Sequence, residues 1–400
     1  MSDRASRPKR RVGRRIAGIV ALGVLITVVA LVVEAWPALG GRLAGDRLAR
    51  AQQSPQYLDG AFRNVLPQQG QLSMASAAWS FFTDDTPYKE PAEPLTTVAR
   101  TAEDFATLRD SLRVTWLGHS TLLVELDSAR VLIDPVWGER VSPSRFLGTR
   151  RFVPSPLALE DLPPLDAVLI SHDHYDHLDM PTVQRLQARV AQWVVPLGVG
   201  AHLEHWGIAP EAITELDWWE SIRVAGLELV STPARHFSGR SLGDTAATLW
   251  TGWAILGRDQ RVFYSGDTAL TPSFAEVGRR YGPFDLTLIE SGAYNAGWTD
   301  VHLGPEQAVT VHRMVEGRVL MPVHWGMFNL AMHGWTEPGE RILAAAETLG
   351  IPVAFPKPGE SVTADVFPTG RWWPDRPWQT ATEAPAISSG LPDSVLALIP

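Results

Sequence analysis

The sequence predicts an α/β fold, a four-layer αββα sandwich in which two mixed β-sheets pack face to face, preceded by a transmembrane helix. Strand-like runs rich in β-branched residues recur between residues 113 and 323, and helical candidates lie among them without strict strand–helix alternation. This order favours two packed sheets with outer helices over a doubly wound parallel sheet. An uncharged apolar run near the N-terminus predicts the preceding helix.

The composition limits the chemistry. Of the 400 residues, 45% are hydrophobic and 20% are charged, which is typical of a packed globular protein. The net charge is −9 and much of the positive charge lies in one N-terminal cluster, which argues against binding of nucleic acid. The chain has no cysteine, which excludes a disulfide framework, a thiol nucleophile, a cysteine-liganded zinc and an iron–sulfur cluster. Any metal must be held by histidine, aspartate or glutamate.

The N-terminus has the features of a membrane anchor. Residues 1–15 form a basic segment, and residues 16–33 carry no charge and rise about 27 Å as a helix, close to the hydrocarbon thickness of a bilayer. Trp36 suits the membrane interface and Pro37 ends the helix. We predict that residues 16–36 are a transmembrane anchor, with a cleaved export signal or a buried helix as alternatives. The positive-inside rule then places the basic segment in the cytoplasm and the body on the periplasmic or extracellular side.

The remaining chain divides by composition. Residues 37–110 are rich in Pro, Gln, Ser and Ala, and we expect a linker and an irregular extension that wraps the body. Residues 111–365 form the predicted sandwich domain, and residues 366–400 a Trp/Pro-rich tail that packs against it and ends in an extended or disordered stretch. The predicted strands are a meander in 113–134, then 167–170, 227–233, 248–256, 261–265, 286–290 and 319–323. The predicted helices are 181–191, 198–206, 272–281, 305–316 and 338–349.

A single short loop carries most of the predicted metal ligands. An apolar strand ends at Ile170, and five of the six residues from His172 to His177 are potential ligands. His172 and His174 can point toward one position while Asp176 and His177 face another a few ångströms away. This spacing predicts a site for two cations.

Further ligands are expected where later strands end. His236, Asp267 and His324 each follow a buried apolar run, and such strand ends meet at one rim of a sheet sandwich. Each of these residues alone could be an ordinary turn or core residue. Together with the ligands of the first loop, each is interpreted as a further metal ligand. Five imidazoles and two carboxylates suit zinc, with Fe or Mn as alternatives. The predicted ligands are His172, His174, Asp176, His177, His236, Asp267 and His324.

These motifs resemble the metallo-β-lactamase superfamily, whose defining loop is H-x-H-x-D-H. Within it, the sequence is similar to the N-acylphosphatidylethanolamine phospholipase D-like branch over roughly residues 54–360. Ascorbate-phosphate lactonase-like proteins share the GHST-type opening and the HWG-type ending. The matching segments are SPQYLDGAFRN (54–64), TWLGHSTLLVEL (115–126), ARHFSGR (234–240), YSGDT (264–268), ESGAYNAGW (290–298) and PVHWGMFNLAMHGWTEP (322–338).

The resemblance implies the metallo-β-lactamase fold and a role for each ligand. It gives His172, His174 and His236 to the first metal, and Asp176, His177 and His324 to the second. Asp267 bridges both ions, and it and Asp176 act in catalysis through a hydroxide held between the ions. Classical β-lactamases use cysteine in the second site, so its absence here favours phosphodiester or ester substrates over β-lactams.

The resemblance and the motif contexts suggest residues around the metals. Arg240, Tyr175 and His302 are expected to contact substrate, Arg240 through the phosphate, and His119 and His333 to support the ligands or the pocket. Asp173, Asp179 and Glu290 are candidates for orienting ligand imidazoles. His202, His205 and His312 lie in helical candidates and are expected to be ordinary surface or core histidines.

The sequence therefore predicts a zinc hydrolase that meets its substrate at a membrane. The resemblance implies a phosphodiesterase acting on a phospholipid-like substrate, as in release of an N-acylethanolamine and phosphatidic acid, and the anchor suits a lipid substrate. One alternative is a lactonase or other small-ester hydrolase of the same fold. The other is a metal-binding envelope protein without turnover.

Overall fold

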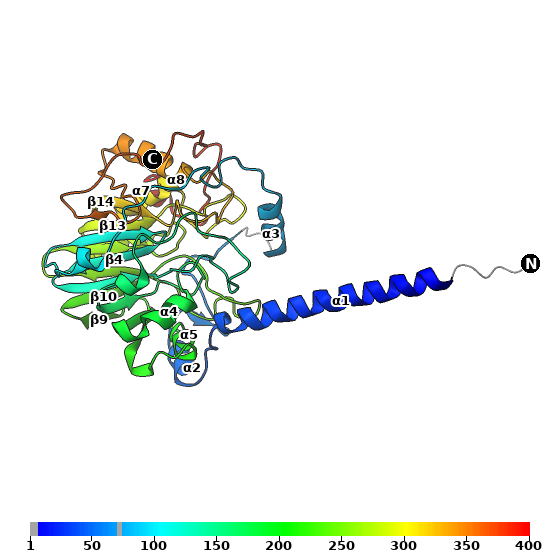
Figure 1. The fold of residues 1–400 in the computed structure, drawn as a ribbon. Coiled ribbons are helices and arrows are strands. Elements are labelled where there is room, and N and C mark those ends of the chain that lie inside the picture. The colour runs from blue at the N-terminus through cyan, green and yellow to red at the C-terminus, as the bar shows by residue number, and fades with distance from the viewer. Residues whose placement is uncertain (1–6, 70–73) are drawn as a thin grey trace, which may run out of the picture.

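Two β-sheets lie face to face at the centre of the protein (Figure 1). The structure is a computed structural model that describes residues 7–69 and 74–400, and within these residues one sheet has seven strands and the other six. The seven-stranded sheet has the order β15-β3-β4-β5-β6-β7-β8, and the six-stranded sheet has the order β14-β13-β12-β11-β10-β9. In each sheet one part is antiparallel and the other parallel. The expectation of two mixed sheets is therefore confirmed.

The strands are short and mostly buried. Those of the seven-stranded sheet are β3 (Arg113–Gly118), β4 (Thr121–Leu126), β5 (Ala129–Ile133), β6 (Leu165–Leu169), β7 (Val190–Pro196), β8 (Ile213–Leu216) and β15 (Ser361–Val362). Those of the six-stranded sheet are β9 (Ser221–Val224), β10 (Leu227–Thr232), β11 (Gly252–Leu256), β12 (Arg261–Tyr264), β13 (Phe284–Glu290) and β14 (Gly317–Val323). A separate hairpin joins β1 (Tyr57–Leu58) and β2 (Ala61–Phe62).

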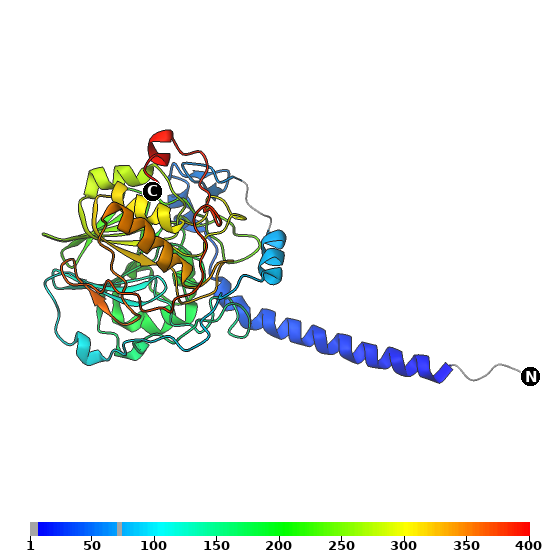
Figure 2. The ribbon, with the colours of Figure 1, turned by 90° about the horizontal axis from the view of Figure 1, so that it is seen from above.

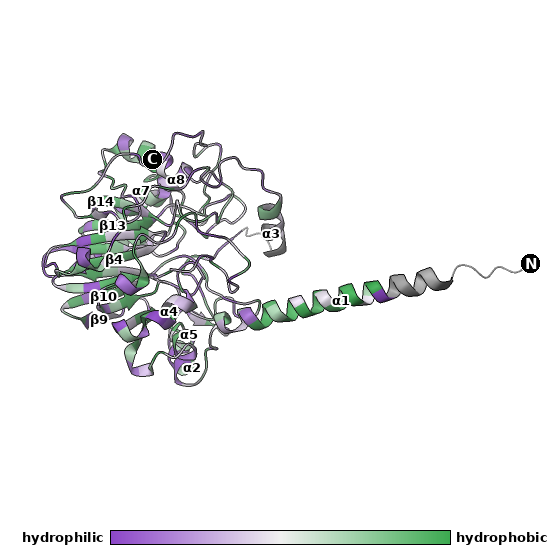
Figure 3. Cartoon of the chain, viewed as in Figure 1, coloured by the Kyte–Doolittle hydropathy of each residue, from purple (hydrophilic) through white to green (hydrophobic). Residues whose placement is uncertain are grey.

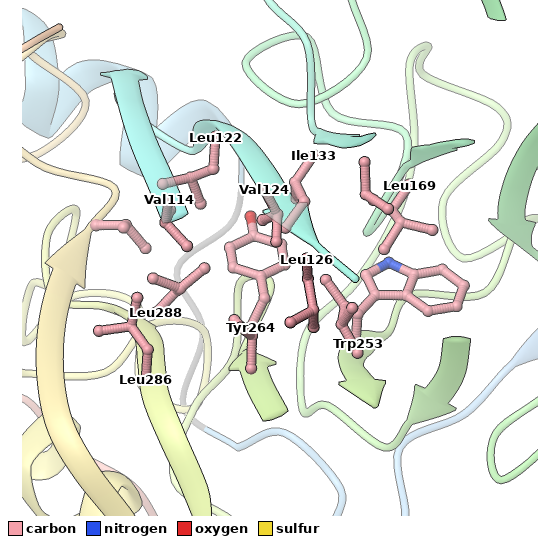
Figure 4. Packing of buried hydrophobic residues seen from close by; sticks show 14 of the residues in the cluster. Val114, Leu122, Val124, Leu126, Ile133, Leu169, Trp253, Tyr264, Leu286 and Leu288 are labelled. Carbon is pink, nitrogen blue, oxygen red and sulfur yellow. The ribbon is translucent and has the colours of Figure 1, made fainter. Parts of the chain in front are cut away.

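The main core fills the space between the sheets. Alternate residues of each strand point inward, so Val124 and Leu126 of β4 share one cluster with Leu286 and Leu288 of β13, as Figure 4 shows. Helices cover both outer faces. The seven-stranded sheet packs under α4 (Met180–Leu186) and α5 (Gly200–His205), and the six-stranded sheet under α6 (Ser273–Tyr281), α7 (Pro305–Met314) and α8 (Glu337–Leu349). This arrangement makes the four layers.

Six strands of the described residues lie where the sequence analysis assigned none, namely β1, β2, β7, β8, β9 and β15. The predicted helix over 181–191 is α4, which ends at Leu186, and β7 begins at Val190. The strands β8 and β9 have four residues each, and β1, β2 and β15 have two each, so their hydrophobic signal is weak. Of these, β8, β9 and β15 lie at edges of the two large sheets.

The N-terminal helix α1 (Arg7–Ala35) extends away from the body (Figures 1 and 2). The segment Arg15–Leu39 has a mean hydropathy of 3.0 over its most apolar window and makes no buried contact there, and its apolar residues colour most of the helix in Figure 3. By length and composition it is a candidate membrane span, although a signal sequence meets the same criteria. Residues 1–6 of the predicted basic segment lie outside the described residues.

The segments before and after the sandwich are packed against it. The extension contains α2 (Gly45–Ala51) and α3 (Met74–Thr83), and Phe62 is buried with a backbone bond to Ala246. In the tail, Trp372 and Trp373 pack among the aromatic rings of the body. The final stretch is extended and hydrogen-bonded, since the Ser389 backbone amide donates to Asp300 (2.6 Å), and it ends in α9 (Asp393–Leu396). Short 3-10 helices are η1 (Trp36–Leu39), η2 (Ala102–Phe105), η3 (Leu159–Asp161), η4 (Gln187–Arg189) and η5 (Pro210–Ala212).

Candidate metal centre

The strand directions explain why distant residues meet. Within the six-stranded sheet β10, β12, β13 and β14 run the same way, and within the seven-stranded sheet β3, β5 and β6 do. The carboxyl ends of these strands bring their following loops to one rim, as in other α/β sheets. The loop after β6 carries His172 to His177, and His236, Asp267 and His324 follow β10, β12 and β14. The structure therefore brings the seven predicted ligands together.

The first group consists of three imidazoles. His172 Nε2 lies 2.9 Å from His174 Nδ1, and His236 Nε2 lies 3.3 Å from the same atom. All three nitrogens lie within 4.8 Å of one another. The opposite nitrogen of His236 donates to the Val301 carbonyl at 2.9 Å, which leaves its Nε2 lone pair facing the group.

The second group lies beside the first and contains a carboxylate. Asp176 Oδ2 is 3.2 Å from His324 Nε2 and 3.4 Å from His177 Nε2. His119 Nε2 reaches the same oxygen at 2.9 Å. His119 and His324 both have positive φ, 54° and 63°, a backbone strain that is typical of functional sites.

Asp267 lies between the two groups. Its Oδ1 is 3.2 Å from His177 Nε2, and its Oδ2 is 3.1 Å from His324 Nε2 and 3.8 Å from His172 Nε2. The preceding Gly266 has φ 59°, and a Cβ there would come within 2.4 Å of the Thr251 carbonyl oxygen. Glycine is therefore required for the turn that presents this carboxylate to both groups.

The unpaired atoms in the centre fit divalent cations. His177 Nε2 and Asp267 Oδ1 are buried and face each other at 3.2 Å without the geometry of a hydrogen bond, an arrangement that is costly unless a ligand satisfies both atoms. Burial alone would lower the pKa of His324, but the charge of Asp267 and its hydrogen bonds raise it to about 10. A raised pKa means that His324 carries a proton at neutral pH in the absence of metal. Binding of a cation to His324 would release this proton. Imidazole and carboxylate donors without thiolate suit zinc, and do not exclude Fe or Mn.

Asp134 orients His177 and was not singled out from the sequence. It follows β5, and its Oδ2 accepts hydrogen bonds from His177 Nδ1 (2.7 Å), Ser171 Oγ (2.6 Å) and Tyr264 Oη (2.6 Å). Its other oxygen accepts from the Ser171 backbone amide at 2.7 Å. The acceptor on Nδ1 fixes the tautomer of His177 and leaves Nε2 free for a ligand bond. The signal in the sequence that could have identified Asp134 was its position as an acidic residue directly after an apolar strand.

An Asp134→Asn variant should therefore lower metal affinity and kcat/KM by about 10–100-fold, because losing the carboxylate charge weakens the orientation of His177. Isothermal titration with Zn²⁺ and rates at saturating metal measure the two effects. Asp166→Asn is a matched control, because Asp166 on β6 accepts from the Arg130 backbone amide of β5 and does not contact the metal ligands. Unchanged affinity and rate in Asp134→Asn would remove the assigned role.

Two predicted supporting histidines take different places. His119 holds Asp176, and burial lowers its pKa to about 3, so the neutral ring donates from Nε2 to the carboxylate. His333 lies farther out, where its Nε2 accepts from the Ala293 amide and its ring stacks on Tyr294 with centroids 4.5 Å apart. His333 also lines a small pocket next to His324.

His302 lies at the edge of the centre. Its Nδ1 is 2.8 Å from Glu290 Oε2 and 3.8 Å from Asp267 Oδ2, and its ring stacks on His324. Glu290 also accepts from the Thr268 and Leu303 amides. Glu290 is thus a buried, hydrogen-bonded carboxyl that contacts His302. Its burial raises its pKa above the ordinary value. The side chain of His302 is partly exposed, and its expected contact with substrate stays a prediction.

Arg240 and Tyr175, which were expected to contact substrate, lie against each other beside the ligand loop. The Arg240 guanidinium is buried, with Nη1 donating to the Leu178 carbonyl (2.9 Å) and to the Asp173 carbonyl, and Nε donating to the Ala38 carbonyl (2.9 Å). The Tyr175 hydroxyl donates to the Arg240 carbonyl at 2.6 Å, and its ring lies under the guanidinium at 4.1 Å. With Nη1 and Nε engaged on backbone carbonyls, Arg240 holds the ligand loop in place, while its Nη2 is buried without a hydrogen-bond partner. The expected contact of Arg240 with a phosphate stays a prediction.

The remaining candidates support the loop or the core. Asp173 accepts from the Gly239 amide (2.7 Å) and Thr248 Oγ1 (2.9 Å) and lies 3.3 Å from His202 Nε2. Asp179 accepts from the Gly138 amide and from Thr182 at the start of α4. His202 is thus more than an ordinary core histidine, because it pairs with a carboxylate of the ligand loop. In contrast, His312 is a core residue bonded to Thr287, and His205 lies at the end of α5.

Comparisons with known proteins place the chain in a family. Residues 129–325 match the family model described as "Beta-lactamase superfamily domain". An uncharacterised protein of Mycobacterium tuberculosis is 44% identical over 377 residues, which cover 91% of this chain and 99% of that protein. The N-acyl-phosphatidylethanolamine-hydrolyzing phospholipase D 1 of Caenorhabditis elegans is 38% identical over 255 residues, 60% of this chain and 71% of the relative.

The solved structures agree on the fold. A possible metal-dependent hydrolase from Veillonella parvula is 19% identical with a TM-score of 0.51, and the match covers 64% of this chain and 100% of that one. At this identity the likeness supports the fold alone. Together the matches confirm the predicted fold class and the resemblance from which the ligand roles were inferred.

Proposed function

The chain belongs to the metallo-β-lactamase superfamily of metal-dependent hydrolases, in the branch similar to N-acylphosphatidylethanolamine phospholipase D, and on this premise we propose that it is a binuclear zinc-dependent phosphodiesterase acting on phospholipid-like substrates. The observation that carries the proposal is Asp267, whose carboxylate lies within 3.8 Å of imidazole nitrogens from both groups of ligands in one buried centre. A pair of bound zinc ions would supply an activated water and charge stabilisation for the phosphoryl oxygens.

The protein residues prepare the centre for this chemistry. His119 and Asp134 hold Asp176 and His177 in fixed orientations, so little reorganisation is needed when metal and substrate bind. The backbone contacts of Arg240 fix the loop that carries four of the ligands. His302, backed by the Glu290 carboxylate, is placed to hold or transfer a proton on the substrate side.

A lipid substrate is supported by two independent features. The relative from Caenorhabditis elegans is named for hydrolysis of N-acyl-phosphatidylethanolamine. The apolar helix α1 would hold the body at a membrane, where such diesters are found. We propose that α1 is an uncleaved anchor and that, by the positive-inside rule, the body faces the periplasm or the outside of the cell. A lactonase or small-ester hydrolase remains the second candidate, because fold and metal chemistry alone also serve those substrates.

Purified protein loaded with Zn²⁺ should hydrolyse a chromogenic phosphodiester and N-acyl-phosphatidylethanolamine in mixed micelles faster than it hydrolyses a panel of lactones. A chelator should abolish the rate and added Zn²⁺ should restore it. A rate confined to lactones would support the second candidate. Stoichiometric binding of metal with no turnover of any compound would instead support a metal-binding envelope protein.

A further inference from the structure

Exposed apolar residues gather around the base of α1. Two of them, Phe146 and Leu147, lie in the loop after β5 and are 57% and 55% exposed. This loop contacts the end of the helix directly, because Ser144 Oγ donates to Glu34 Oε2 at 2.7 Å and the Arg145 amide donates to Glu34 Oε1 at 3.1 Å. The loop is therefore fixed at the level where α1 enters the body.

A second apolar element projects from the same face. The helix α3 has no charged residue, and its Trp79 and Phe82 are 67% and 83% exposed. In both views α3 lies on the side of the body from which α1 leaves (Figures 1 and 2). An uncharged helix that exposes large aromatic rings to water is unfavourable unless another apolar phase covers it.

A third point is fixed to the base of α1 through Arg240. Leu242, which is 89% exposed, lies two residues beyond Arg240, whose Nε donates to the carbonyl of Ala38 at 2.9 Å. Two segments far apart in the sequence are thus linked to residues 34–38, and α3 lies on the same side of the body. We call Trp79, Phe82, Phe146, Leu147 and Leu242 the apolar collar.

We propose that the apolar collar inserts into the interface of the bilayer that α1 crosses, so that the body is docked on the membrane with the metal centre held against lipid. This inference rests on the proposed membrane-anchored function. If α1 spans the bilayer, Glu34 lies at its boundary, and the loop that Glu34 contacts must lie at the headgroups. Aromatic rings are favoured at this depth. Arg145, whose guanidinium lies 4.7 Å from the Phe146 ring, would reach lipid phosphates.

Docking of this kind accounts for the placement of the site relative to the anchor. Arg240 links the Ala38 carbonyl to the carbonyls of Asp173 and Leu178, so the ligand loop and the base of α1 are one contact apart. A flexible tether would leave the site free to face water. Insertion of the apolar collar instead fixes the orientation of the body on the membrane. The metal centre then lies near the headgroup region, where a lipid headgroup can reach it.

The absence of cysteine from the chain allows a direct test on the full-length protein. Single variants Phe146→Cys, Phe82→Cys and Leu242→Cys are labelled with an environment-sensitive nitrobenzoxadiazole probe and reconstituted in phosphatidylcholine–phosphatidylglycerol vesicles. Val366→Cys is the control, because Val366 is exposed and follows Asp365, which pairs with Arg318 at the end of β14 opposite to His324. The collar positions should show blue-shifted emission and quenching by spin-labelled lipid, and the control should show neither.

Equal spectra at the collar and control positions would overturn the proposal, and so would shifts that depend on protein density rather than on quencher lipid, which would indicate contact between copies. This readout does not require activity, so it is independent of the substrate assignment. A Phe146→Asp variant adds a functional arm. It should keep its rate on a soluble phosphodiester and lose about threefold or more on lipid in vesicles. Equal rates on both substrates would also contradict docking through this loop.

Discussion

An Asp267→Asn variant is expected to lose about 10³-fold or more in kcat/KM and to bind less zinc than the unaltered chain. The two carboxylate oxygens face His177 and His324 at 3.2 and 3.1 Å, and His172 and His236 at 3.8 Å. The asparagine amide has one acceptor oxygen and no charge. Its NH2 group would replace one carboxylate oxygen and would present a donor to imidazole nitrogens that need an acceptor or a metal. The expected factor corresponds to about 4 kcal/mol of transition-state stabilisation, within the range attributed to metal-centre electrostatics.

The experiment combines metal analysis of the purified variant with rates at saturating Zn²⁺. Asp217→Asn is a matched control, because Asp217 is also buried but caps a turn through the Trp218 amide. The unfolding temperature of the metal-free Asp267→Asn variant should fall, because the Asp267 charge lies 3.2 Å from His177 and 3.1 Å from His324, and its loss leaves these buried imidazoles without a counter-charge. Two zinc ions and a full rate in this variant would show that the carboxylate does not join the two groups.

The metal ligands could be predicted because their signal is concentrated in one loop and at strand ends. Five potential ligands in six residues are rare in a purely structural loop, and this loop supported the assignment of His236, Asp267 and His324 as further ligands. Parallel strand direction then placed those residues at a single rim. The position of Asp267 between the two groups of ligands depends on the packing of the sheets. From the sequence, it could be expected only through the resemblance to the metallo-β-lactamase superfamily.

The residues that orient the ligands were harder to predict. Asp134 ends a strand as many aspartates do, and its role depends on partners from β6 and β12 that only the packed sandwich brings to it. The position of Arg240 suggested a phosphate contact, and the structure adds a role that the sequence did not indicate, because Nε and Nη1 donate to the backbone carbonyls of residues 38, 173 and 178. Backbone acceptors carry no sequence signal, so a buried arginine of this kind cannot be told from a substrate-binding one by its neighbours along the chain.

A chain that lacks residues 1–41 is expected to be less stable than one that lacks residues 1–34 by about 2–4 kcal/mol. The shorter deletion removes the exposed part of α1 and leaves the segment 36–41 in place. In the intact protein the Ala38 carbonyl accepts from Arg240 Nε (2.9 Å), and the Pro37 carbonyl accepts from Trp206 Nε1 (2.8 Å). A hydrogen bond to a buried charged donor contributes about 1.5–3 kcal/mol and a neutral one about 1 kcal/mol, so the longer deletion loses both contributions.

The same loss should reach the metal centre. Without Ala38, the Arg240 guanidinium gains solvent access and holds the carbonyls of Asp173 and Leu178 less firmly, so the ligand loop loosens. We therefore expect the 42–400 chain to bind Zn²⁺ more weakly, while the 35–400 chain retains the affinity of the full-length protein. An Arg240→Lys variant of the full chain should reproduce the weaker binding, because an ammonium cannot keep three fixed contacts. Urea unfolding measures the stability of these proteins, and titration with Zn²⁺ measures their metal affinity. Equal stability and equal affinity in both truncated chains would show that the segment after α1 is only a tether.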